Sequence, residues 1–172
     1  MKNSIKFLSL LLIMLTSFGL SISAQNKKAD KDTRNWVYEI EPVSVGAQGS
    51  YLIKVWSYSK KPIVALEQAK KNAVHGIIFK GFTGIQGVPG QRPLTNNPNL
   101  EVEQAEFFKN FFAEGGKYMK FVNITNDGSV AAEDRLKIGK EYKIGVVVSV
   151  NVAGLRKDLE DAGMVRGLSS GF

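Results

Sequence analysis

The chain carries few of the residue types that do chemistry in enzyme active sites. His75 is the single histidine, and none of the 172 residues is a cysteine. Thiolate nucleophiles, disulfides and cysteine metal sites are therefore excluded, and no second histidine is present to complete a zinc site. A Ser-His-acid triad would have to use His75. We interpret His75 as a packing or surface residue near the end of a helix.

The acidic residues do not supply the missing chemistry. Glu133 and Asp134 are neighbours in the sequence, as are Glu160 and Asp161. Adjacent side chains point apart on a helix or a strand, so neither pair is suited to general acid-base catalysis. We expect no catalytic residues, no metal site and no cofactor, and hence a protein that is not an enzyme. An unrecognised hydrolase is the least favoured alternative.

Glycines at a spacing of three mark a segment suited to recognition. Gly81, Gly84, Gly87 and Gly90 lie in an irregular stretch over residues 81–99 that also holds three prolines. Loops of this length are uncommon and are usually functional or disordered. The series lacks the Gly-Lys-Ser/Thr end of a phosphate-binding loop. As a recognition loop, it offers apolar and cationic candidate contacts to a partner: Phe82, Ile85, Val88 and Arg92.

Aromatic side chains suggest a second kind of site. Trp36, Trp56 and Tyr58 would be exposed ring surfaces for a sugar or another small ligand, if they lie on the outside of the domain. Trp56 and Tyr58 are also candidate partner contacts. Four phenylalanines over residues 107–112 are interpreted mainly as core.

Alternating segments predict the strands that position these residues. Residues 36–45 and 51–58 alternate with period two around a Gly-containing turn, which predicts a β-hairpin. Residues 142–152 place six apolar side chains on one face, which favours an antiparallel strand covered on one side, with Val148 in the core. Residues 118–125 read as a further strand, and residues 130–138 are ambiguous.

Helical spacing predicts the other layer. A helix over residues 62–80 begins at a proline, and Glu67 and Lys71 are expected to pair on its exposed side. A second helix follows Asn99, and a short third one covers residues 155–162. The first helix carries a narrow row of small residues able to approach a sheet closely: Ala65, Ala69 and Ala73. The predicted fold is α+β, a two-layer sandwich with a mostly antiparallel sheet of four or five strands and two or three helices on one face.

The N-terminus predicts export. Lys2 and Lys6 precede an uncharged run over residues 7–20 that is richest in apolar residues at its start, and small residues follow up to Ala24. This order is typical of a secretory signal peptide, here over residues 1–24. The alternative, a retained membrane anchor, needs a longer apolar core.

The predicted mature chain is one domain with a polar leader. Residues 25–35 are polar and charged and are expected to form a disordered tail before a single domain over residues 36–172. Cleavage after Ala24 leaves 148 residues with a surplus of five positive charges. Export argues against nucleic acid as a partner, and the charge favours anionic envelope surfaces or an acidic partner.

One segment carries a family resemblance. Tyr51 to Gly81 pairs a strand with the pattern Ala65-x3-Ala69-Lys70-x2-Ala73. It resembles the small α+β domain of certain bacterial outer-membrane lipoproteins, also found at the start of a flagellar assembly protein. The resemblance implies an alanine-rich helix on a curved sheet and a non-catalytic role in envelope assemblies. The chain lacks the lipid-bearing cysteine of those lipoproteins, and no functional residue is carried over.

These observations together favour an interaction protein. We expect an exported, non-enzymatic module of a bacterial envelope or secretion assembly that binds an envelope protein and keeps no membrane span after signal cleavage. Periplasmic, outer-membrane-associated and secreted locations all fit this expectation. The alternative is a small-ligand or glycan-binding protein of the periplasm or cell surface.

Overall fold

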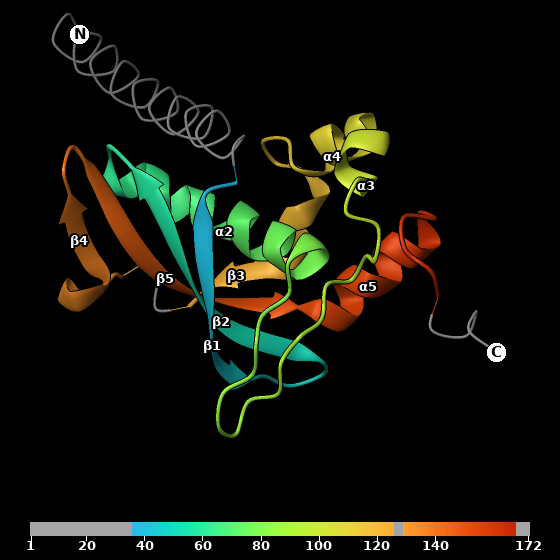
Figure 1. Ribbon diagram of the computed structural model, residues 1–172, viewed down its shortest axis with the longest axis horizontal. Coiled ribbons are helices and arrows are strands. Elements are labelled where there is room, and N and C mark those ends of the chain that lie inside the picture. The colour runs from blue at the N-terminus through green and yellow to red at the C-terminus, as the bar shows by residue number, and fades with distance from the viewer. Residues whose placement is uncertain (1–35, 126–128, 168–172) are drawn as a thin grey trace, which may run out of the picture.

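The computed structural model describes residues 36–125 and 129–167 as a curled antiparallel sheet with helices packed on it (Figure 1). The predicted signal peptide and tail lie outside the described residues. Strand order is β1-β2-β5-β3, and β4 pairs with the first part of β5. The strand bounds are β1 Tyr38–Val45, β2 Ser50–Ser59, β3 Val122–Ile124, β4 Arg135–Ile138 and β5 Glu141–Asn151.

The predicted hairpin is confirmed as β1 and β2. Tyr38 pairs with Ser57, and the register shifts between Pro42 and Ser44. A proline has no amide hydrogen to donate to a ladder, so an edge strand with a bulge is where it is tolerated. β2 then pairs with β5 along its whole length, from Ser50 to Ser59. This central pair forms the rigid floor of the domain.

Helix α2 (Pro62–Phe79) covers one face of that floor. Its alanine row, Ala65, Ala69 and Ala73, is fully buried, as the spacing predicts. The predicted exposed pair of Glu67 with Lys71 is wrong. Lys70 instead pairs with Glu67 at 3.3 Å, and Lys71 is buried with its Nζ 5.6 Å from the Tyr118 ring centroid. Lys70 is an i,i+3 neighbour of Glu67 and is half-buried like it, while Lys71 faces the elements packed on the helix.

The remaining helices close the layer. The predicted second helix is split at Gln104 into α3 (Leu100–Glu103) and α4 (Ala105–Phe111). Residues 117–121 form a 3₁₀ helix, η2 (Lys117–Phe121), where a strand was expected to begin, and the strand β3 follows it. The ambiguous segment contains a 3₁₀ turn, η4 (Ala132–Asp134), and then β4. Helix α5 (Val152–Asp161) matches the predicted third helix.

The core lies between the sheet and the helices. The apolar face of β5 is buried, and Val148 is fully enclosed between Ile53 of β2 and Ile124 of β3, its partners in the ladder. Phe108, Phe111 and Phe112 complete the core, as predicted, while Phe107 is half-buried. The predicted α+β fold is confirmed. No helix among residues 36–125 and 129–167 is long and apolar enough to cross a membrane.

Candidate functional site

The glycine-rich segment forms an ordered finger, residues 82–91, rather than an irregular loop. Phe82 and Gln91 exchange backbone hydrogen bonds of 2.8 and 3.0 Å, and Ile85 and Val88 exchange two of 3.0 Å. After the finger, the amides of Leu94 and Thr95 donate to carbonyls in the last turns of α2, each at 3.1 Å. Figure 1 shows the finger leaving α2 and returning to α3 by way of the lowest point in that view.

The period-three glycines explain why the two arms of the finger approach so closely. A Cβ on Gly84 would lie 2.6 Å from the Gly90 nitrogen, and a Cβ on Gly90 would lie 2.9 Å from the Gly84 nitrogen. Gly87 has a φ of +79° at the tip, a conformation that side chains with a Cβ rarely adopt. Glycine at these positions therefore permits a narrow two-armed structure.

The predicted contacts divide between the tip and the base of the finger. Ile85 is 54% exposed at the tip, and Arg92 is exposed just beyond Gln91. Val88 is buried, and Phe82 packs edge-on against Tyr51 with ring centroids 5.3 Å apart. Val88 is thus not available to a partner in this conformation, because its side chain is buried.

The open face of the sheet holds the other predicted contacts. Trp56, expected to be exposed, is only 9% exposed, so that expectation is wrong. Its ring lies on the backbone of β5, where a Cβ on Gly145 would come within 2.8 Å of it. The ammonium groups of Lys54 and Lys143 lie 5.5 and 4.9 Å from the ring centroid. Trp56 is buried because Gly145 leaves the β5 backbone open to its ring and because Lys54 and Lys143 cover the ring.

The same lysines are tied down by carboxylates. Lys143 Nζ donates to Glu39 at 2.8 Å, and the Tyr58 hydroxyl donates to the other oxygen of Glu39 at 2.5 Å. Lys54 Nζ donates to Asp134 at 2.7 Å. Tyr58 is therefore at the surface, but its hydroxyl is hydrogen-bonded to Glu39. Trp56 and Tyr58 do not form an open aromatic platform for a sugar.

Four residues from three distant segments meet in a polar cluster, the clasp, made of Trp36, Tyr38, His75 and Glu101. The Trp36 ring stacks on His75 at 3.7 Å between centroids and 16° between planes, and its Nε1 donates to Glu101 at 2.7 Å. The other Glu101 oxygen lies 3.2 Å from His75 Nε2, and the Tyr38 hydroxyl lies 2.6 Å from His75 Nδ1. Because a carboxylate only accepts, neutral His75 donates from Nε2 and accepts from Tyr38 at Nδ1.

Burial sets the electrostatics of the clasp. Desolvation lowers the pKa of His75 below its ordinary value, although the hydrogen bond to Glu101 acts in the opposite direction. Burial works to raise the pKa of Glu101, but the hydrogen bonds from His75 and Trp36 outweigh it, so the pKa is lowered. Burial also raises the pKa of Tyr38 far above its usual range. The stable form is thus a neutral imidazole between a neutral phenol and a carboxylate.

The clasp is built to hold segments together rather than to meet a substrate. His75 is 4% exposed, and both of its nitrogens are hydrogen-bonded. The clasp joins the start of the described domain to α2 and to α3. The interpretation of His75 as a packing residue therefore fits the geometry. No sequence pattern indicates its partners, since Trp36 and Glu101 are 65 positions apart.

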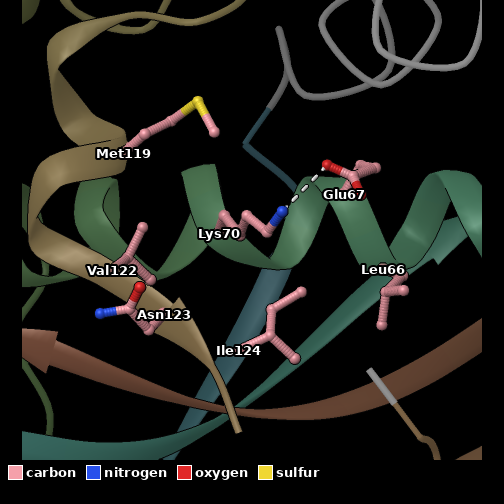
Figure 2. A pocket seen from close by; sticks show the side chains of 7 residues that line it. All are labelled: Leu66, Glu67, Lys70, Met119, Val122, Asn123 and Ile124. Carbon is pink, nitrogen blue, oxygen red and sulfur yellow. Dashed lines mark hydrogen bonds and ion pairs between the residues drawn. The ribbon is translucent and has the colours of Figure 1, made fainter. Parts of the chain in front are cut away.

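A shallow groove lies between α2 and the edge of the sheet (Figure 2). Its volume is about 380 Å³, and the ion pair of Lys70 with Glu67 lies at its α2 side. The lining side chains come from α2, η2 and β3: Leu66, Glu67, Lys70, Met119, Val122, Asn123 and Ile124. Sequence reasoning missed this groove, because its walls come from segments that only the sheet topology brings together.

Residues 36–125 and 129–167 contain no group of three or more His, Asp or Glu side chains that could hold a metal ion. Ser169 stands in a Gly-x-Ser-x-Gly string over residues 167–171, the pattern of a hydrolase nucleophile turn, but it lies outside the described residues. Comparisons with known protein families, with curated proteins and with solved structures found no match to this chain. The resemblance to the lipoprotein domain stays a prediction.

Proposed function

We propose that this chain is an exported, non-enzymatic interaction module of a bacterial envelope or secretion assembly, and that the finger contacts its protein partner. Support for export comes from the order of charged, apolar and small residues before Gln25. Support for an interaction role comes chiefly from the finger. The clasp does not favour a catalytic role, because His75 is buried and both of its nitrogens are hydrogen-bonded.

The observation that carries the proposal is an exposed apolar side chain on a hydrogen-bonded support. Ile85 is 54% exposed in a finger whose two arms are joined by backbone hydrogen bonds, which restrict its conformation before any partner arrives. Preorganised contacts lose little conformational entropy on binding, which is the property of effective interface anchors. Arg92 adds an exposed cation at the base of the finger, and arginine is enriched at protein interfaces.

The test compares two exposed apolar residues in the native host. Ile85→Asp should leave the domain folded but abolish the crosslinks that wild-type protein forms in intact cells, as identified by mass spectrometry. Val102→Asp is the matched control, because Val102 is 79% exposed on α3, outside the finger. Point variants are preferable to deletion of the finger, since Val88 within it is buried.

Unchanged crosslinks in a folded Ile85→Asp variant would refute the role of the finger. Equal loss in both variants would show a general effect of surface charge and would also count against it. Cleavage at Gln25 is read separately, from the N-terminal peptide of the cell-envelope fraction. An intact N-terminus in that fraction would contradict the predicted signal peptide without bearing on the finger.

The groove favours a second candidate function, binding of a small ligand. Its volume of about 380 Å³ is at the lower end of the range for ligand pockets, about 300–1,000 Å³. Leu66, Met119 and Ile124 give it apolar walls, and the ion pair of Lys70 with Glu67 gives it a polar side. An amphipathic ligand with a polar head group would match both. A ligand screen by thermal shift, repeated on Leu66→Asp, should lose its hits in the variant; hits that persist place the ligand elsewhere.

A further inference from the structure

We propose that one end of the sheet, the basic end, docks the protein on an anionic phospholipid surface. The basic end consists of the connection between β2 and α2 together with β4 and the turn that leads into β5. Exposed cations and exposed apolar side chains alternate there. This inference is independent of the finger, which lies beyond the opposite end of the β2–β5 pair.

The sheet register brings the two segments of the basic end together. Ser59, the last residue of β2, pairs with Tyr142 near the start of β5. Ile138, the last residue of β4, pairs with Glu141. The chain between β2 and α2 and the chain between β4 and β5 therefore leave the sheet at the same end. Figure 1 shows both connections at the upper left of the domain.

The charge of the basic end indicates an anionic partner. It exposes five cationic side chains: Lys60, Lys61, Arg135, Lys137 and Lys140. None of them forms an ion pair with another residue in the described part of the chain. Two exposed carboxylates, Glu133 and Glu141, stand in the same region, so a surplus of three positive charges remains. Elsewhere on the sheet, Lys54 and Lys143 are neutralised by carboxylates.

Apolar side chains at the same end distinguish a lipid surface from a purely ionic partner. The three exposed ones are Ile63, Leu136 and Ile138, which are 42, 44 and 51% exposed. On β4, leucine and isoleucine alternate with arginine and lysine, and all four residues are exposed. Such a surface can lower its apolar groups to the acyl boundary while the long cationic side chains reach back to phosphate. An acidic protein would pair with the cationic side chains but would leave the exposed apolar side chains in water.

The test uses sedimentation with lipid vesicles. The chain starting at Gln25 should bind to vesicles of equimolar phosphatidylglycerol and phosphatidylcholine. It should bind much less to vesicles of phosphatidylcholine alone. Each cation near an anionic surface contributes about a fivefold change in partitioning, so Lys137→Gln with Lys140→Gln should weaken binding about 25-fold. Raising salt should weaken binding as well, because the charges are exposed.

Two controls make the outcome specific. Lys109→Gln with Lys120→Gln removes the same charge from exposed sites on α4 and η2 and should bind nearly as well as wild type. Ile138→Asp should lose binding, while Ile85→Asp at the finger should keep it. Absence of vesicle binding by the wild-type chain overturns the proposal, as do equal binding to both vesicles and equal loss in the two double variants.

Discussion

Replacing His75 by phenylalanine should destabilise the domain more than replacing His75 and Tyr38 together. In the wild type the Tyr38 hydroxyl lies 2.6 Å from His75 Nδ1, and both residues are buried. His75→Phe keeps an aromatic ring between Trp36 and Phe79 but removes the acceptor. The hydroxyl then remains buried without that partner. Adding Tyr38→Phe removes the orphaned group at almost no change in ring shape.

The magnitudes follow from the asymmetry of hydrogen bonding. A buried hydrogen bond contributes about 0.5–1.5 kcal/mol net, whereas an unsatisfied buried polar group costs about 1–3 kcal/mol. His75→Phe should therefore lower the free energy of unfolding by about 2–4 kcal/mol, and the double variant by about 1–2 kcal/mol. Any steric cost of the larger ring is common to both variants and cancels in the double-mutant cycle.

The assay is urea unfolding followed by circular dichroism at neutral pH for wild type, both single variants and the double variant. The coupling energy between Tyr38 and His75 should be at least about 1 kcal/mol. Additive losses would show that the two side chains do not depend on each other, and the assignment of the clasp as a hydrogen-bonded unit would be refuted. Equal m-values across the set would confirm that the variants share one native state.

Three further outcomes are expected. Stability should fall with acidification, because below the ordinary pKa of His75, 6.5, and then below that of Glu101, 4.5, the unfolded chain takes up a proton that the native group resists. The His75→Phe variant should therefore have a flatter stability profile between these two pH values in urea titrations at several pH values. Val148→Asp should largely unfold the domain, because an unpaired charge in a fully buried site costs several kcal/mol against a total of about 5–15 kcal/mol; a near-native melting temperature would contradict the placement of Val148. Gly84→Ala should loosen only the finger, since its Cβ would come within 2.6 Å of the Gly90 nitrogen, and faster amide exchange at Ile85 and Val88 with an unchanged sheet would show it; unchanged exchange would mean that the finger tolerates the methyl group.

Local periodicity was sufficient to predict the main elements. The alternation over residues 142–152 and the alanine row of α2 each report which side of an element is apolar, and both elements formed with those sides buried. The weaker assignments failed where no period was present. Residues 117–121 became a 3₁₀ helix, and the helix after Asn99 broke at Gln104. Short segments of this kind take their conformation from the neighbours that they pack against.

The α+β fold, the buried face of β5 and a special role for the glycines at residues 81–90 could all be predicted from residue patterns. What those glycines do depends on how the chain packs, since Gly84 and Gly90 matter through their mutual approach. The same holds for Trp56, which is buried because Gly145 of another strand leaves room for its ring. The clasp and the basic end likewise join residues far apart in the chain. Period and composition fix which side of an element is apolar, but the groups that meet across elements depend on sheet register and helix packing.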